Sequence, residues 1–352
     1  MELIARTSTL ILGAGPTGQA ALRHLQRLGQ DCAVWDTRSE PQIESAFTSA
    51  FPDVSFGMGS LDASYLNQFD EIVVSPGVAP STPGLAETST RQVSDIQLFR
   101  RAWPESRRLV AITGSNAKST VTTLVGDILN AAGIDARVGG NLGPQALDLL
   151  AQAGDDSVAV LELSSFQLAR TTGLKATVAT CLNMSPDHLD WHGSMIAYHQ
   201  AKHRIFEGVG AIVVNAEDPL SNPLVPDQTP KISFALQQPD FHRFGVLTHQ
   251  GEDWIALGVD PWMPVNELPI PGKHMILNVM AAFAIAELLG VDKEVCRRVA
   301  AQFRGLPHRM VDLGVKRGIR FINDSKGTNV GASQTAIQSA KSQGPVILLA
   351  GG

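Results

Sequence analysis

Residues 109–120 read Leu109-Val110-Ala111-Ile112-Thr113-Gly114-Ser115-Asn116-Ala117-Lys118-Ser119-Thr120, an apolar, β-favouring run that leads into a turn, a lysine and two hydroxyl residues. Apolar residues at helical spacing follow over 121–132, so the pattern predicts a strand, a turn and a helix. The N–H groups and the dipole at such a helix N-terminus favour an anion. We interpret the stretch as a phosphate cradle, in which Lys118 neutralises phosphate charge and Ser119 or Thr120 holds Mg²⁺.

The turn departs from the strict phosphate-loop pattern, which has glycine six residues before the lysine and again directly before it. Ile112 and Ala117 occupy those places here, so the spacing alone describes a degenerate phosphate loop. Glycine tolerates more backbone conformations than alanine, and we expect Ala117 to adopt one that it reaches without strain. The alternative is an ordinary strand-to-helix turn with a surface lysine.

Length and composition indicate a globular protein of two or three domains, since the chain has 352 residues and 44% of them are apolar. The net charge of −6 argues against nucleic acid as the main partner. Three isolated cysteines, Cys32, Cys181 and Cys296, favour a reducing compartment without disulfides or a metal cluster. The sequence has neither a bilayer-length apolar run nor a signal-peptide layout, so we expect a cytoplasmic protein without a membrane partner.

The first segment carries a dinucleotide-binding fingerprint. An expected strand at 9–12 runs into Gly13-Ala14-Gly15-Pro16-Thr17-Gly18, and a second strand at 32–35 ends at Asp36-Thr37-Arg38. A third expected strand, 71–74, ends in Ser75-Pro76-Gly77-Val78. Because the carboxyl ends of parallel strands meet at one edge, we expect these three loops to line one crevice, with Asp36 accepting hydrogen bonds from a ribose or a base. A Rossmann turn without a ligand is the alternative. Residues 80–90 are an expected loop, and 100–108 an expected polar linker.

The second segment brings polar residues to three further strand ends. Expected strands at 157–161, 176–182 and 211–214 deliver Glu162, Asp187 with His188, and Asn215. A carboxylate at a strand end beside a phosphate cradle suits Mg²⁺, which prefers oxygen ligands. The alternatives are a helix-capping role for Glu162, a structural role for His188 and a solvated Lys202 in the helix at 198–206.

The pattern in the rest of the chain predicts one or two antiparallel hairpins within 234–263, at an edge of the sheet, and helices at 274–289 and 293–303. The last segment predicts a strand at 320–323, a helix at 332–340 and a buried strand at 346–350. One such unit cannot cover a parallel sheet, so we expect the polypeptide to be part of a longer one.

Five motifs in chain order resemble those of the Mur ligase family, the ATP-dependent amide-bond ligases of peptidoglycan precursor synthesis. They stand at 113–119 (T-G-[ST]-N-G-K-[ST], with Ala117 in place of glycine), 162–167 (E-x-S-S-F-Q), 183–190 (N-x-x-x-D-H-x-D), 305–309 (G-L-P-H-R) and 323–329 (N-D-S-K-x-T-N). The resemblance implies an α/β, three-domain Mur ligase architecture. Its parts would be a Rossmann-like domain at 1–105, a central P-loop ATPase-like domain with a parallel sheet at 106–305 and the start of a Rossmann-like ligase domain at 306–352.

The N-terminal motifs resemble the branch of the family that adds D-glutamate, which implies UDP-N-acetylmuramoyl-L-alanine, D-glutamate and ATP as substrates and a monomer as the working form. The crevice would then hold the uridine diphosphate end of a sugar nucleotide rather than NAD. The resemblance assigns sugar-nucleotide binding to Pro16, Thr17, Gly18, Asp36, Thr37, Arg38, Ser75, Pro76 and Gly77.

The same resemblance implies roles around ATP. The ATP contacts would be Gly114, Ser115, Asn116, Ala117, Lys118, Ser119, Thr120, Asn278, Arg309 and Asp324. Two Mg²⁺ sites would use Ser119, Glu162, His188 and a carbamylated Lys202. Asn141 would contact the acyl phosphate, and Lys326 and Thr328 would lie toward the phosphoryl and glutamate sites; the catalytic set would be Lys118, His188, Lys202, Asn141, Arg309 and Lys326. The family has two asparagines three apart on the adenine side, where this chain has Met275 and Asn278.

Three alternatives remain for the function. One is another ATP-dependent ligase of the superfamily, such as a folylpolyglutamate synthase. The nucleotide-binding crevice predicted in the N-terminal segment argues against this class of ligase. A second is a nucleotide-binding module without full activity, which would leave Glu162, His188 and Lys202 idle. The third is an NAD oxidoreductase, which leaves the second and third segments unexplained.

Overall fold

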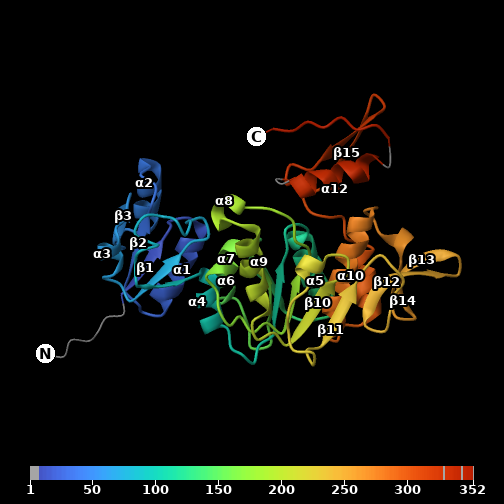
Figure 1. Ribbon diagram of the computed structural model, residues 1–352, viewed down its shortest axis with the longest axis horizontal. Coiled ribbons are helices and arrows are strands. Elements are labelled where there is room, and N and C mark those ends of the chain that lie inside the picture. The colour runs from blue at the N-terminus through green and yellow to red at the C-terminus, as the bar shows by residue number, and fades with distance from the viewer. Residues whose placement is uncertain (1–7, 328–329, 342–343, 352) are drawn as a thin grey trace. The chain divides into compact units, whose positions relative to one another are not determined.

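The computed structural model describes residues 8–327, 330–341 and 344–351 (Figure 1). The chain forms two compact units, each of which is described by itself. The first contains Met1–Ala111, Arg137–Ala176 and His188–Gly208, and the second contains Ile112–Ala136, Thr177–Asp187 and Val209–Gly352.

A five-stranded parallel sheet organises the N-terminal part of the first unit. Its order is β3-β2-β1-β4-β5, with β1 at Thr9–Leu12, β2 at Cys32–Asp36, β3 at Phe56–Met58, β4 at Glu71–Val74 and β5 at Arg91–Val93. All four residues of β1 are buried, as expected for a central strand with both faces covered. The accompanying helices are α1 (Pro16–Arg27), α2 (Pro41–Ala50), α3 (Ala63–Leu66) and α4 (Asp95–Ala102). The strands predicted at 9–12, 32–35 and 71–74 are therefore confirmed.

The second sheet has nine strands in the order β14-β13-β12-β11-β10-β9-β6-β8-β7. The bounds are β6 Leu109–Thr113, β7 Ala136–Gly140, β8 Val158–Glu162, β9 Val178–Cys181, β10 Ala211–Asn215, β11 Lys231–Phe234, β12 Arg243–His249, β13 Glu252–Leu257 and β14 Asp260–Pro264. The pairs β12–β13 and β13–β14 are antiparallel and end the sheet, which confirms the hairpins predicted at its edge. The parallel strand β11 was not predicted.

The helices and turns from α5 to η2 connect these strands, and η3, α10 and α11 follow the last of them. They are α5 Lys118–Ala131, α6 Ala146–Leu149, α7 Ser165–Ala169, α8 Leu189–His192, α9 Met195–His203, η1 Arg204–Phe206, η2 Pro219–Ser221, η3 Val265–Glu267, α10 Lys273–Leu288 and α11 Lys293–Ala300. Residues 279–286 of α10 are all buried, and this helix packs on α5. The hydrophobic contact holds the helix that starts at the cradle, because burial of apolar side chains is the main source of such packing energy.

The last described segment forms an antiparallel hairpin, β15 (Val311–Lys316) with β16 (Ile319–Asn323), followed by α12 (Val330–Lys341). The buried strand predicted at 346–350 is wrong, since this run is irregular and Ile347 and Leu349 are 86% and 91% exposed. A strand needs a partner for its N–H and C=O groups, and no strand of the described residues pairs with this run.

The polar linker predicted at 100–108 is also wrong in its first half. Helix α4 continues to Ala102, and Arg100 is buried, with Nη1 donating to the carbonyl oxygen of Trp103. Long arginine stems pack against apolar surface, and cations suit the last turn of a helix, so a basic run does not by itself mark a linker.

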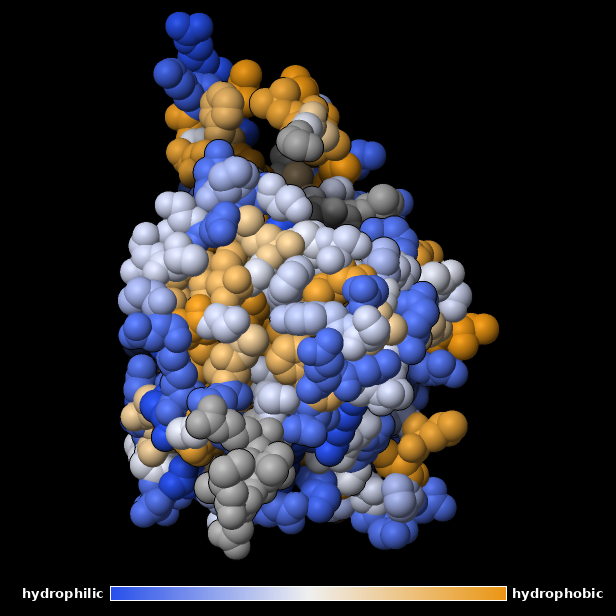
Figure 2. Space-filling view, turned by 90° about the vertical axis from the view of Figure 1, so that its left-hand side faces the viewer, coloured by the Kyte–Doolittle hydropathy of each residue, from blue (hydrophilic) through white to orange (hydrophobic). Residues whose placement is uncertain are grey.

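The surface in Figure 2 interleaves blue hydrophilic residues with smaller orange hydrophobic areas, as folded proteins in water commonly do. Among the helices that the structure describes, none combines the length and the apolar composition needed to cross a membrane.

Candidate active site

The turn between β6 and α5 folds around its own lysine. Lys118 Nζ donates hydrogen bonds to the carbonyl oxygens of Gly114 at 2.8 Å and Ser115 at 2.9 Å. Ser119 and Thr120, the two hydroxyl residues that follow, are buried in the first turn of α5. The predicted strand, turn and helix are confirmed, and the lysine lies at the helix N-terminus, where an anion is favoured.

Ala117 departs from the expectation of an unstrained backbone. It is the N-terminal flanking residue of α5 and has φ 67° and ψ −4°, in the left-handed region. A Cβ atom makes that region unfavourable for any residue except glycine, so the strain-free expectation is wrong. The turn requires the glycine-like conformation because the chain must reverse there before the helix begins.

We expect Ala117→Gly to raise the free energy of unfolding by about 1 kcal/mol, since relief of the left-handed strain exceeds the entropy that glycine adds to the unfolded chain. Chemical denaturation measures this change. The matched control is Ala132→Gly, at φ −83°, which should lower stability by about 0.5–1 kcal/mol. Destabilisation of similar size in both variants would contradict the strain at Ala117.

Asn183 clamps the cradle from the end of β9. The Asn116 N–H donates to Asn183 Oδ1 at 2.8 Å, and Asn183 Nδ2 donates back to the Asn116 carbonyl at 3.1 Å. The Ser115 N–H also donates to the Asn183 carbonyl at 2.9 Å, and Ser115 Oγ donates to that of Ser185 at 2.9 Å. Sequence reasoning placed Asn183 in a motif but assigned it no role, because its partner lies 67 residues away.

Glu162 is a buried carboxylate with one oxygen in use. It is 2% exposed, and Oε1 accepts a hydrogen bond from Asn141 Nδ2 at 2.8 Å. Oε2 is buried and has no hydrogen-bond partner in the described part of the chain. The helix-cap alternative is wrong, because Ser164 and Gln167 form the capping box of α7. A buried carboxylate oxygen without a partner is costly, and a divalent cation would satisfy it.

Lys202 is also buried, so the alternative of a solvated lysine is wrong. It is 2% exposed on α9, and its Nζ lies 4.9 Å from the centroid of the Tyr198 ring. His188 stands directly before α8 with φ 52°, and its ring centroid is 4.7 Å from that of Phe166.

His192 is a neighbour that sequence reasoning missed. Its Nε2 lies 2.9 Å from Ser165 Oγ. Burial, followed by the charge of Lys202, lowers the pKa of His192 to about 4. Its only sequence signal is its position four residues after His188, at the end of the short helix that His188 precedes.

The third segment reaches the cradle through Arg309, whose Nη2 donates to Ser119 Oγ at 2.9 Å. Asp324 Oδ1 accepts from the Met310 N–H at 3.1 Å, and burial raises the pKa of this carboxyl. Lys326 is exposed, and Asn278 is half-buried on α10. Thr328 lies outside the described residues.

The three loops predicted to line one crevice lie side by side in the first unit. The Gly13 N–H donates to the Trp35 carbonyl at 2.7 Å, and the Ser75 N–H donates to that of Leu12 at 2.9 Å. A Cβ on Gly18 would lie 1.8 Å from the Gly13 carbonyl oxygen, whereas one on Gly15 would meet nothing within 4 Å. The adjacency of the loops is confirmed, and the turn leaves open space beside Gly15.

The flanks of this crevice hold the remaining predicted residues. Pro16 begins α1, and Thr17 Oγ1 donates to Gln145 Oε1 at 2.9 Å. Pro76 is half-buried, and Gly77 is exposed. Thr37 follows Asp36 at the end of β2.

Asp36 anchors the turn. It is 2% exposed; Oδ2 accepts from the Ala14 N–H and Oδ1 from the Arg38 N–H, while the Arg38 guanidinium bonds both oxygens. Burial alone would raise the pKa of Asp36, but these hydrogen bonds outweigh it and lower the pKa to about 2. The Arg38 side chain remains 56% exposed.

We expect Asp36→Asn to lower the free energy of unfolding by about 2 kcal/mol at neutral pH. The folded pKa of about 2 is below the ordinary value of 3.8, so this stabilisation is present above about pH 4 and is lost as pH falls through about 2. Denaturation of both proteins as a function of pH tests this: their stabilities should converge in acid. Asp53→Asn, at an exposed position, is the control, and an Asp36→Asn effect no larger than its own would contradict the anchor.

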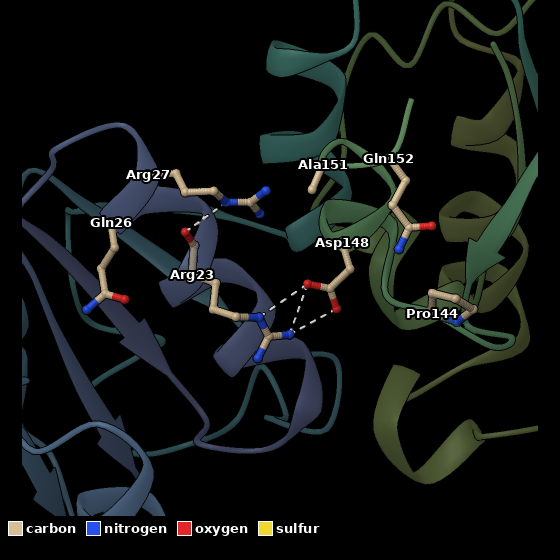
Figure 3. Close-up of a pocket in the computed structure, with 7 residues that line it drawn as sticks. All are labelled: Arg23, Gln26, Arg27, Pro144, Asp148, Ala151 and Gln152. Carbon is tan, nitrogen blue, oxygen red and sulfur yellow. Dashed lines mark hydrogen bonds and ion pairs between the residues drawn. The ribbon is translucent and has the colours of Figure 1, made fainter. Parts of the chain in front are cut away.

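A separate cavity of about 790 Å³ lies between α1 and α6 (Figure 3). Arg23 and Asp148 face one another across it and form an ion pair of 2.9 Å. None of the residues predicted for the active site lines this cavity.

Two family descriptions match the chain. Residues 112–286 match "Mur ligase middle domain", and residues 7–96 match "Mur ligase MurD-like, N-terminal domain".

Among the relatives that match nearly the whole chain are proteins described as UDP-N-acetylmuramoylalanine--D-glutamate ligase. The protein from Chromohalobacter salexigens is 45% identical, with 100% of this chain and 78% of the relative covered. The protein from Pseudomonas aeruginosa is 44% identical, with 100% of this chain and 79% of the relative covered. The one from Acinetobacter baylyi is also 44% identical, with 97% of this chain and 77% of the relative covered.

Solved structures resemble the fold at lower identity. A UDP-N-acetylmuramate-alanine ligase from Thermotoga maritima has a TM-score of 0.58 and 19% identity, covering 95% of this chain and 77% of that one. A murein peptide ligase from Psychrobacter arcticus has a TM-score of 0.57 and 19% identity, covering 96% and 76%.

Proposed function

The chain belongs to the Mur ligase family, and we propose that it joins D-glutamate to UDP-N-acetylmuramoyl-L-alanine, with ATP converted to ADP and phosphate, in peptidoglycan precursor synthesis. The observation that carries this proposal is the 45% identity to a D-glutamate ligase over the whole of this chain and 78% of the relative. The cradle around Lys118 and the crevice beside Gly15 supply places of suitable chemistry for ATP and for a sugar nucleotide.

The reaction requires two anions to meet. The γ-phosphate of ATP passes to the carboxylate of the L-alanyl end, and the amine of D-glutamate then displaces phosphate from the acyl phosphate. Like charges repel strongly in a site that excludes water, so cations must lie between them. Lys118 would neutralise the transferred phosphoryl group, and Arg309, which donates to Ser119 Oγ, brings a second cation to the same loop.

The residues present fit a magnesium ion. Glu162 Oε2, which is buried and has no hydrogen-bond partner in the described residues, is an oxygen ligand of the kind that Mg²⁺ prefers. The proposed ligand Ser119 offers a hydroxyl oxygen, which suits the same ion. Such an ion, when bound, neutralises phosphate charge and polarises the phosphoryl oxygens. Asn141 would hold Glu162 in place through its 2.8 Å hydrogen bond and would contact the acyl phosphate.

A second magnesium site would use His188 and a carbamylated Lys202. Burial supports the modification, because carbamylation replaces a desolvated ammonium group by an anionic oxygen ligand. Asn278 and Asp324 would contact the adenosine part of ATP, and Lys326 and Thr328 would lie toward the phosphoryl and glutamate sites.

We also propose the domain limits 1–105, 106–305 and 306–352, together with a monomeric form acting in the cytoplasm. The matches at 7–96 and 112–286 support the first boundary. Cys32, Cys181 and Cys296 are all unbridged, which is consistent with a reducing compartment.

The function is tested by ADP release from the chain supplied with ATP, UDP-N-acetylmuramoyl-L-alanine and D-glutamate. Release should require all three substrates, with L-glutamate and the sugar nucleotide lacking L-alanine as controls. Thermal stabilisation by the uridine sugar nucleotide but not by NADH is the expected binding result. Stabilisation by NADH alone, or ADP release with folates in place of the sugar nucleotide, would contradict the proposal.

A further inference from the structure

A second cavity, of about 230 Å³, lies in the first unit, and none of the residues assigned above lines it. Its walls come from β5, α4, the end of α7 and η1, and three arginines are among them, Arg91, Arg170 and Arg204. No aspartate or glutamate lines it. Three cations around a small space without a lining carboxylate make an environment that attracts anions.

Arg170 has the strongest need for a partner. Its Nη1 and Nη2 atoms are buried and have no hydrogen-bond partner in the described part of the chain. Its guanidinium carbon lies 5.4 Å from the centroid of the Trp191 ring, a contact that stabilises charge but leaves the N–H donors unsatisfied. Burial lowers the pKa of Arg170 to about 10, so the group stays protonated at neutral pH. A buried, charged donor without an acceptor is costly, and an anion would compensate it.

Arg204 and Gln97 add further donors to the lining, whereas Gln92 Nε2 already donates to the Leu85 carbonyl at 2.7 Å. Arg204 Nη1 makes one long hydrogen bond of 3.4 Å, to the Thr171 carbonyl. Gln97 Oε1 accepts hydrogen bonds from the N–H of Thr172 at 2.8 Å and from its hydroxyl at 3.2 Å. The side-chain nitrogen of Gln97 can therefore donate to a ligand in the cavity. The Arg91 side chain is 64% exposed, and its Nε lies 3.7 Å from Glu71 Oε2.

We propose that this cavity binds a small oxyanion of the phosphate class. Guanidinium groups match the tetrahedral oxygens of phosphate through paired hydrogen bonds, which lysine does not offer. The volume is below the roughly 300–1,000 Å³ of drug-sized ligand sites, so it suits inorganic phosphate or pyrophosphate rather than a whole nucleotide. The inference does not depend on the proposed reaction.

Occupation of the site would reinforce the packing of α4 on α7. That packing already contains the hydroxyl pair Ser94–Thr171 at 2.7 Å and the hydrogen bond from Gln167 Nε2 to Asp95 Oδ2 at 3.0 Å. Since α7 begins three residues after Glu162, the anion would hold the helix that follows the proposed magnesium ligand.

The test is calorimetric titration of the full chain with inorganic phosphate at constant ionic strength, with sulfate and pyrophosphate as parallel probes. Because the cradle is itself proposed to bind phosphate, the titration is made in the Lys118→Gln variant, which should retain one phosphate site. In that background Arg170→Gln and Arg204→Gln should each weaken binding about tenfold or more. Arg298→Gln removes the same charge from an exposed position on α11 and should change nothing.

Circular dichroism and thermal unfolding establish that each variant is folded. If Arg170→Gln does not fold, Arg204→Gln and the conservative Arg170→Lys decide the question, since both keep a hydrogen-bonding side chain. Phosphate affinity that is the same in the Arg204, Arg170 and Arg298 variants, or no phosphate site in the Lys118→Gln protein, would overturn the proposal. Tighter binding of pyrophosphate than of phosphate would identify the larger anion as the occupant.

Discussion

Lys118→Ala is expected to lower ATP-dependent product formation about 1000-fold or more, because it removes the cation at the start of α5 where phosphoryl charge develops. In the structure the ammonium group is held by the Gly114 and Ser115 carbonyls, at 2.8 and 2.9 Å. Phosphate oxygens would replace or supplement these acceptors when ATP binds. A coupled assay of ADP release with all three substrates measures the effect.

Binding measurements separate loss of chemistry from loss of fold in this variant. Stabilisation by the uridine sugar nucleotide should persist, since its proposed contacts lie around Gly15 and Arg38. The control is Lys175→Ala, which removes an exposed lysine that pairs with Glu105 at 2.8 Å and should retain the normal rate. A normal rate in Lys118→Ala would show that the cradle is not the ATP loop.

Lys202→Ala is expected to lower activity roughly 100-fold or more, because the proposed carbamate supplies an anionic oxygen to the second metal ion. Bicarbonate at high concentration should not restore activity, since the amine that reacts with carbon dioxide is gone. Lys202→Met should lose activity to a similar extent, although methionine fills more of the buried volume than alanine does. An equal loss in both variants therefore points to the missing carbamate and not to a cavity.

Carbon-13 NMR of protein in labelled bicarbonate provides the independent readout. The unaltered chain should show a carbamate signal that Lys202→Met lacks. Gln200→Ala, at an exposed position on α9, is the matched control and should keep both signal and rate. Normal activity in Lys202→Met would contradict the carbamate, and so would the same carbamate signal in both proteins.

Local patterns predicted the elements around both nucleotide loops. Residues 10–12, 72–74 and 109–112 are all apolar and buried, and such runs become buried parallel strands because helices cover both faces of the sheet. The run at 346–350 has the same apolar pattern, but the strand predicted there is wrong, since an apolar run becomes a strand only where a partner strand is available.

Several site features had no local signal. Ala117 looks like a neutral replacement in the sequence, but its left-handed φ of 67° follows from how the turn enters α5. Asp36 looks available for a ligand, yet its oxygens already accept hydrogen bonds from Ala14 and Arg38. Arg170 lies in no motif, and it becomes a candidate because its Nη1 and Nη2 atoms are buried and have no hydrogen-bond partner among the described residues.

The sequence by itself determined that residues 109–120 form a strand, a turn and a helix with a lysine at the helix start, because strand and helix periodicity and the end effects of a helix act over a few residues. Only the tertiary structure decided what holds that turn. Asn183 reaches Asn116 across 67 residues, and Arg309 reaches Ser119 across 190. Hydrogen bonds between such distant residues depend on how strands and helices pack, which no short stretch of sequence specifies.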